Sequence, residues 1–174
     1  MTDLVLLATL LDGPKHGYQL KKQAGMIFGQ RALHNNLVYP LLRRFTAAGW
    51  VTRKTVPGER GQKRQQYAIT TGGMQALVER LSDFSDEAAY SHDGFRLRVA
   101  LFPFLAGETR GRILSAREAA LSDIDGRMEA MQKTADLSLY PGEVLRFTRE
   151  QLARELAWIH RLRKIPPKKE RKHV

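Results

Sequence analysis

Apolar side chains in the first 30 residues recur with the spacing of two short helices. Residues 4–11 are apolar on almost every side, which is typical of a buried helix. The run Asp12-Gly13-Pro14 should end this helix, because glycine suits a left-handed cap and proline cannot continue a helix. From residue 16 to residue 28 the apolar positions, Tyr18 among them, again fit a helix. We therefore expect two packed helices, with Tyr18 in the core.

A third helix is expected to begin at Asn35 or Asn36, since asparagine is a favoured N-cap, and to end at Gly49. Its apolar positions form one stripe, Val38, Leu41, Leu42 and Phe45. Tyr39 lies in the first turn, and Arg43 and Arg44 project from later turns. The helix should therefore pack on the protein through one side and offer cations from the rest.

Residues 50–70 have the pattern of a β-hairpin. Residues 50–56 are rich in β-branched side chains, which predicts a strand. Residues 57–64 form a basic, turn-rich loop, and residues 65–70 place Tyr67 and Ile69 on one face of a returning strand. Thr70 or Thr71 should then cap a fourth helix.

The second half of the chain predicts further helices. Residues 95–104 fit either a strand or a helix, and we favour the helix because no partner strand is visible nearby. A longer helix follows, with apolar positions from Leu114 to Met131. Tyr140-Pro141-Gly142 should break the chain before a last helix over residues 143–164.

The last helix is predicted to hold two copies of the chain together. Its apolar side chains are spaced nearly as in the seam of a coiled coil: Leu145, Leu152, Leu156, Ile159 and Leu162. The alternative is that these side chains pack only within their own subunit. We favour dimerisation, because three helices without a sheet would have difficulty covering so many apolar sides in a monomer.

Positive charge is concentrated at the two ends of the chain. The sequence has 29 Lys and Arg against 18 Asp and Glu, a formal net charge of +11. Residues 1–70 carry 11 basic and 3 acidic side chains, a net charge of +8, whereas residues 71–160 have a net charge of −3 and residues 161–174 of +6. A basic surface confined to part of the molecule indicates an anionic partner.

Several kinds of chemistry are excluded or disfavoured. The sequence has no cysteine, and its five histidines show no metal-ligand spacing. No phosphate-binding glycine loop or nucleophile motif occurs, so we expect no enzyme activity, no metal and no cofactor. No apolar run approaches the roughly 18 residues of a membrane span, and the start lacks the pattern of a secretory signal, so a cytoplasmic location is expected.

Three helices followed by a basic hairpin are the element order of a winged helix-turn-helix. The expected fold class is mostly α with a small β-hairpin wing: a winged domain over residues 1–88, a helical dimerisation domain over residues 89–165 and a basic flexible tail over residues 166–174. The third helix can enter the major groove of duplex DNA, and the hairpin cations can reach the phosphates. The candidate DNA-binding residues are Lys15, His16, Asn35, Asn36, Tyr39, Arg43, Arg44, Arg60, Lys63 and Arg64.

Four segments also carry a family pattern: residues 10–20 with His16-Gly17-Tyr18, Val38-Tyr39-Pro40-Leu41-Leu42-Arg43-Arg44-Phe45, Ala48-Gly49-Trp50-Val51, and residues 63–70. In these segments the chain resembles the PadR-like family of transcriptional regulators. Asn35-Asn36-Leu37 departs from the small residues that are usual there, so no operator sequence can be carried over. The resemblance implies a DNA-binding regulator, expected to be a repressor, that dimerises through its helical C-terminal part.

The resemblance further implies that some members respond to a small aromatic effector. Aromatic and methionine side chains of the second half could line a cavity for such a compound, although core packing is favoured for each: Phe102, Phe104, Met128, Met131 and Trp158.

Two other functions fit a basic winged helix. It can bind duplex RNA or the ribosome by shape, or it can serve as a protein-interaction adaptor. The acidic middle of the chain and the expected dimer argue against RNA, and the charge excess in residues 1–70 argues against an adaptor. Gel-shift competition between duplex DNA and duplex RNA would separate these functions.

Overall fold

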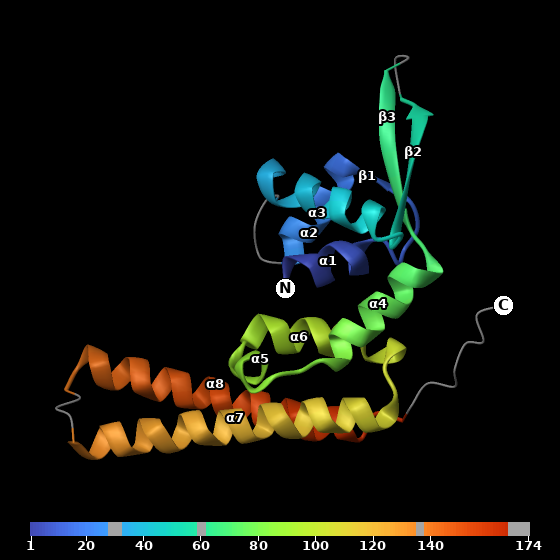
Figure 1. The fold of residues 1–174 in the computed structure, drawn as a ribbon. Coiled ribbons are helices and arrows are strands. Elements are labelled where there is room, and N and C mark those ends of the chain that lie inside the picture. Colours follow the sequence, from blue (N-terminus) through green and yellow to red (C-terminus); the bar gives the residue numbers. More distant parts are fainter. Residues whose placement is uncertain (28–32, 59–61, 135–137, 167–174) are drawn as a thin grey trace. The chain divides into compact units, whose positions relative to one another are not determined.

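The computed structural model describes residues 1–27, 33–58, 62–134 and 138–166, which fall into two compact units, Met1–Asp83 and Phe84–Val174 (Figure 1). The helices are α1 (Thr2–Thr9), α2 (Gly17–Ile27), α3 (Asn35–Ala47), α4 (Thr71–Ser82), α5 (Asp86–Tyr90), α6 (His92–Ala100), α7 (Gly107–Thr134) and α8 (Tyr140–Arg163), with a 3-10 turn at Phe102–Phe104. The strands are β1 (Lys15–His16), β2 (Val51–Pro57) and β3 (Lys63–Ile69). The expected fold class, mostly helical with a small β wing, is confirmed. Among the described residues, no helix combines the length and the apolar character needed to cross a bilayer.

The core of the first unit lies among α1, α2, α3 and α4. α1 packs on α2 and α4, and α3 packs on α2 and β2. The largest fully buried side chains there are Leu6, Leu7, Leu10, Leu20, Leu42, Phe45, Leu77 and Leu81. Because each such side chain stabilises the fold by roughly 1.5–3 kcal/mol through burial, this core holds the exposed side of α3 in a fixed position.

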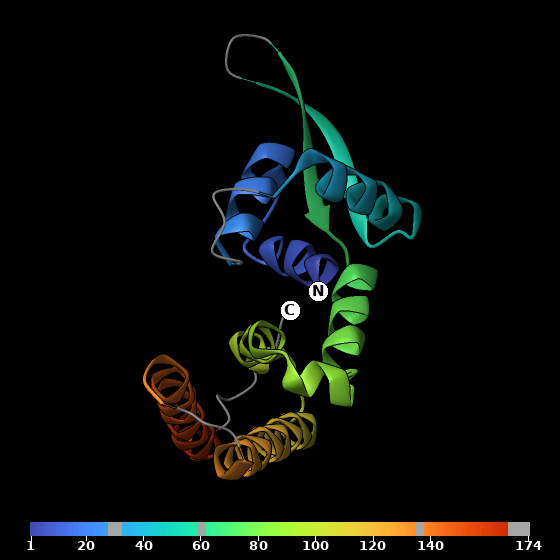
Figure 2. The same cartoon turned by 90° about the vertical axis from the view of Figure 1, so that its left-hand side faces the viewer.

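The sheet has three antiparallel strands in the order β1-β3-β2. β2 and β3 form the expected hairpin, paired from Val51 opposite Ile69 to Pro57 opposite Lys63. The hairpin extends beyond the helices of its unit in both views (Figures 1 and 2). β1 was not predicted, because two residues are too few to show an alternating pattern.

Most helix ends follow local chemistry. Gly49 takes a left-handed φ of 72° after α3, which glycine adopts without steric cost. Thr70 caps α4, since its Oγ1 accepts a hydrogen bond from the Gly73 N–H at 3.0 Å. The predicted cap of α3 was wrong: His34 is its N-cap, and Asn35 is already helical. Tyr18 was also wrongly assigned to the core, because 69% of its surface is exposed.

The second unit is built on the antiparallel pair α7 and α8, with α5 packed on α7 (Figure 1). The segment expected to be a helix over residues 95–104 is helical, as α6 and the following 3-10 turn. Tyr140-Pro141-Gly142 begins α8 instead of breaking the chain, since proline is tolerated in the first turn, where no helical N–H bond is lost. α5 spans the predicted boundary at residue 88 and belongs to the second unit through its packing on α7.

The five side chains predicted to form the seam between two subunits are largely covered within a single chain. Leu145, Leu152 and Ile159 are buried in a single chain, on the side of α8 that meets α7, and Leu156 and Leu162 are half-buried. The alternative, that this stripe packs within its own subunit, therefore describes these three leucine and isoleucine side chains better. The segment beyond Pro166, predicted to be a flexible tail, lies outside the described residues.

Candidate nucleic-acid interface

The exposed side of α3 carries one row of polar and cationic side chains. Asn35, Tyr39 and Arg43 follow one another at intervals of four residues, so they lie on one side of the helix. All three are exposed, as are Asn36 and Arg44. The buried side of α3, with Val38, Leu42 and Phe45, fixes this row in place.

Tyr39 is both packed and exposed. Its ring lies against the first residue of α2, where a Cβ added to Gly17 would come within 3.1 Å of Tyr39 Cε1 and of its hydroxyl oxygen. A Cβ at this position would make a tighter contact than most and would require Tyr39 to move by a few tenths of an ångström, so Gly17 of the His-Gly-Tyr run favours this close approach. The hydroxyl of Tyr39 is thereby held at the junction of α2 and α3.

The start of α3 is tied to α2 by a hydrogen bond. Lys21 Nζ donates to Asn35 Oδ1 at 2.9 Å. This bond occupies one acceptor of Asn35 and leaves Asn36 as the asparagine without such a link to α2. It also places Lys21, which was not among the predicted candidates, beside the exposed row.

Lys15 and His16, two of the candidate DNA-binding residues, lie in the sheet of the first unit. They form β1, where Lys15 is buried opposite Tyr67 in the sheet. His16 Nδ1 lies 3.3 Å from the carbonyl oxygen of Gln65, and the His16 N–H donates to Gln19 Oε1 at 2.9 Å. Both residues therefore serve first to join the start of α2 to the wing.

The wing carries cations on both of its faces. The register places Arg53 and Lys63 on one face and Lys54 and Arg64 on the other, and all four are exposed. Gln65 Nε2 donates to Thr55 Oγ1 at 3.0 Å across the hairpin, which links the two strands near their middle. Arg60, also predicted to bind DNA, lies outside the described residues.

The cations of this surface have no acidic partner among the residues that the structure describes. In the described part of the chain, no carboxylate forms an ion pair with the six side chains Arg43, Arg44, Arg53, Lys54, Lys63 and Arg64. In the second unit, by contrast, arginines such as Arg117, Arg146, Arg149 and Arg163 are paired with Asp or Glu.

An unpaired cationic surface of this kind can neutralise phosphates of a nucleic acid. Arg53 and Lys54 were missed by sequence reasoning, although alternation along β2 would have shown them as exposed. Across the described ranges, no three His, Asp or Glu side chains gather as metal ligands.

Comparison with known proteins identifies the family. Residues 6–79 match the transcriptional regulator PadR-like family. The negative transcriptional regulator PadR of Bacillus subtilis (strain 168) is 26% identical over 140 residues, which cover 75% of each chain.

Solved structures are also similar. The crystal structure of Bacillus subtilis PadR in complex with operator DNA is 22% identical and covers 94% of this chain and 97% of that one, with a TM-score of 0.45. The putative transcriptional regulator TA0346 of Thermoplasma acidophilum is 33% identical over 45% of this chain and 75% of that one, with a TM-score of 0.42. The family is one of regulators and not of enzymes. The match over residues 6–79, together with the similarity to the curated relative, identifies the winged part of this chain as that of a PadR-like transcriptional regulator.

Proposed function

We propose that the protein is a sequence-specific DNA-binding repressor that acts as a homodimer on a palindromic operator. The observation that carries this proposal is the unpaired cationic surface formed by α3 and the wing. These cations lie in the part of the chain whose net charge is +8. Repression is proposed because the curated relative is a negative regulator.

In this proposal α3 reads the bases and the wing grips the backbone. A single α-helix fits the major groove, and Asn36 lies exposed in its first turn, where an amide can bond to the edge of an adenine. The wing cations are long, exposed side chains, which suit phosphates more than base edges. The two elements therefore supply different parts of the binding free energy.

Dimerisation is proposed through the exposed apolar residues at the α7–α8 end of the second unit. Tyr140, Val144 and Phe147 are exposed at helical spacing along the start of α8, and Leu139 and Met131 are exposed near them in sequence. Exposed apolar side chains that cluster in this way are typical of a protein interface. A two-fold axis through them would present two copies of α3 to two half-sites.

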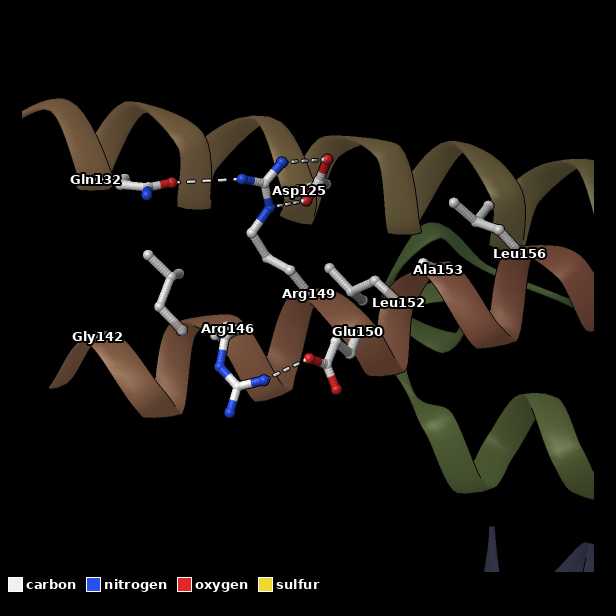
Figure 3. Close-up of a pocket in the computed structure, with 10 residues that line it drawn as sticks. Asp125, Gln132, Gly142, Arg146, Arg149, Glu150, Leu152, Ala153 and Leu156 are labelled. Atoms are coloured by element: carbon white, nitrogen blue, oxygen red, sulfur yellow. Dashed lines mark hydrogen bonds and ion pairs between the residues drawn. The ribbon is translucent and has the colours of Figure 1, made fainter. Parts of the chain in front are cut away.

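A groove beside these residues extends the proposed dimer surface (Figure 3). Its volume is about 630 Å³, and its apolar wall is formed by Leu145, Leu152, Ala153 and Leu156 of α8. Arg149 crosses from α8 to α7, where its Nε donates to Asp125 Oδ1 at 2.7 Å. The groove is thus open and partly apolar, which suits a helix of a second copy.

A small aromatic effector stays a prediction from the family resemblance. The five side chains that could line a cavity for it, and for which core packing is favoured, do not line this groove. Thermal-shift screening of small aromatic acids against the full chain would test for one.

The wing prediction tests DNA binding itself. Lys63→Ala with Arg64→Ala is expected to weaken binding to specific and random duplex DNA alike. It should also flatten the slope of log affinity against log salt by about 0.9 for each phosphate that the variant no longer neutralises. Gel shifts at several salt concentrations measure both effects, with duplex RNA of equal length as the competitor.

The matched control is Arg154→Ala with Arg161→Ala, which removes the same charge from exposed positions of α8 that do not line the groove. It should leave the salt slope unchanged. An unchanged slope for the wing variant, or better binding to the RNA, would contradict the proposal.

The reading prediction concerns α3. Asn36→Ala is expected to weaken the binding free energy by about 1–3 kcal/mol on an operator duplex selected from a random pool, and by little on random duplex DNA. Asn36 is exposed and is not the helix cap, so the melting temperature should change little. Fluorescence anisotropy measures the affinity for each duplex. An equal loss of affinity on both duplexes would assign base reading to another residue.

A further inference from the structure

A small pocket lies between α3 and the base of the wing. Its volume is about 300 Å³, and its lining consists of Leu42, Arg43, Thr46, Ala47, Arg53 and Tyr67. Leu42 and Tyr67 are buried, whereas Arg43 and Arg53 are exposed. The pocket is therefore lined by one arginine of α3 and one of β2, and the charges of both act on the hydroxyl of Tyr67.

No acidic group of the pocket balances these two charges. Its lining contains no carboxylate, and neither arginine forms an ion pair with any described residue. Two guanidinium groups that share one pocket repel each other unless an anion lies between them. The charge arrangement therefore favours an anion that is not part of the protein.

Tyr67 adds a neutral hydroxyl to the pocket. Burial raises the pKa of Tyr67 above its ordinary value, although the charges of Arg53 and Arg43 oppose this shift. The hydroxyl therefore stays protonated at neutral pH and cannot neutralise the arginines. It can donate a hydrogen bond to an anion, and its cross-strand partner Arg53 is close enough to influence its pKa.

We propose that this pocket binds one phosphodiester group of the DNA backbone, held by Arg43 and Arg53 together, with Tyr67 as a positioning residue for Arg53. This inference rests on the proposed function. The two free oxygens of a phosphodiester can each accept hydrogen bonds from one guanidinium. One phosphate would then be bound by α3 and by the wing at once, which fixes how deeply α3 enters the groove.

The test replaces single phosphates of the DNA by neutral methylphosphonates. The probe is the tightest duplex that the full chain selects from a random 30-base-pair pool. Replacement at one position, which recurs in each half-site, should weaken binding of the unaltered protein on the order of ten-fold, as expected for the loss of charge-assisted hydrogen bonds. Arg43→Ala and Arg53→Ala should each bind the unmodified duplex about ten-fold more weakly, and both should lose their sensitivity at that same position.

Lys54→Ala is the matched control. Lys54 is the neighbour of Arg53, carries the same charge and lies on the other face of β2. This variant should keep the full sensitivity at the shared position. Tyr67→Phe keeps the buried ring and should reduce the sensitivity only partly.

The outcomes separate this inference from the proposed function. If the full chain selects no duplex, the proposed function fails, and this inference fails with it. If the chain binds DNA but Arg43→Ala and Arg53→Ala lose sensitivity at different phosphates, or at none, only the shared site is overturned. Circular dichroism of each variant shows that the exposed arginines have been removed from a folded protein.

Discussion

Phe147→Asp is expected to convert the protein from a dimer to a monomer and to lower its affinity for the operator about 10²–10⁴-fold. The affinity falls because two linked half-site interactions become two separate binding events. The variant should fold, since 57% of the Phe147 side chain is exposed in a single chain. In the dimer, by contrast, the new carboxylate would be buried without a partner at a cost of several kcal/mol.

Light scattering measures the oligomeric state, and gel shifts measure the affinity for the operator. Ala157→Asp adds a carboxylate at another exposed position of α8 and should stay a dimer with full affinity. A duplex that carries only one half-site should bind Phe147→Asp as tightly as it binds the unaltered chain, because a single half-site gains nothing from the linkage of two subunits. A dimer that persists in Phe147→Asp with full operator affinity would place the interface elsewhere.

Ile159→Asp gives a useful contrast. Ile159 is 0% exposed within its own chain, so this substitution should unfold the second unit and not simply separate two copies. The heptad-like spacing of α8 shows that one side of the helix is buried. It does not show which helix buries it, and here α7 does so first. Sequence periodicity therefore predicted the buried side of α8 correctly but could not show that α7 of the same chain covers much of it.

The same distinction explains other successes and errors. α3, the wing and the Thr70 cap follow from local signals, namely an apolar stripe, β-branched residues and a hydroxyl at a helix start. Tyr18 follows the helical pattern of its segment but lies on the exposed side of α2, because Leu20 and Ala24 define the buried side. The apolar spacing alone did not distinguish these two sides.

The candidate site shows a similar limit. The cations of α3 and of the turn-rich end of the wing could be named as candidates, since basic residues in a turn-rich hairpin have little structural use, whereas Arg53 and Lys54 were missed. The hydrogen bond from Lys21 to Asn35 and the pocket shared by Arg43 and Arg53 could not. Both depend on how elements distant in sequence pack together, which no local pattern contains.

Arg117→Met is expected to destabilise the second unit by about 3–5 kcal/mol. Only 4% of the Arg117 side chain is exposed. Its Nε donates to Glu155 Oε1 at 2.8 Å, its Nη2 to Oε2 at 3.0 Å, and its Nη1 to the carbonyl oxygen of Ala89 at 2.7 Å. One guanidinium thus joins α5, α7 and α8, and its loss would leave the carboxylate of Glu155 buried without its main partner.

Chemical unfolding, followed by the fluorescence of Trp158 in a Trp50→Phe background, measures this loss in the second unit. Arg117→Met with Glu155→Leu is the matched control. It removes both charges, and its free energy of unfolding should be close to that of the unaltered protein, because replacing a whole buried ion pair by apolar side chains is often neutral. If the double variant is as unstable as the single one, the penalty comes from lost packing and not from the carboxylate.

The pH dependence gives a sharper test of the same pair. Burial alone would raise the pKa of Glu155, but the hydrogen bonds and charge of Arg117, with a smaller contribution from His92, hold it below its ordinary value. A carboxyl group whose pKa is lower in the folded state stabilises the fold above its unfolded pKa. That stability is lost as the pH falls through the folded pKa.

Without Arg117, burial becomes the dominant influence, and the pKa of Glu155 should rise. Protonation of Glu155 then removes the buried charge. The destabilisation caused by Arg117→Met should therefore become smaller as the solution becomes acidic. His92, whose Nδ1 lies 3.0 Å from Glu155 Oε2, still lies beside the carboxylate in this variant. The gap in unfolding free energy between the unaltered protein and Arg117→Met should therefore narrow between neutral pH and the acidic range where the carboxyl titrates. A gap that stays constant over this range would show that Glu155 does not carry the effect.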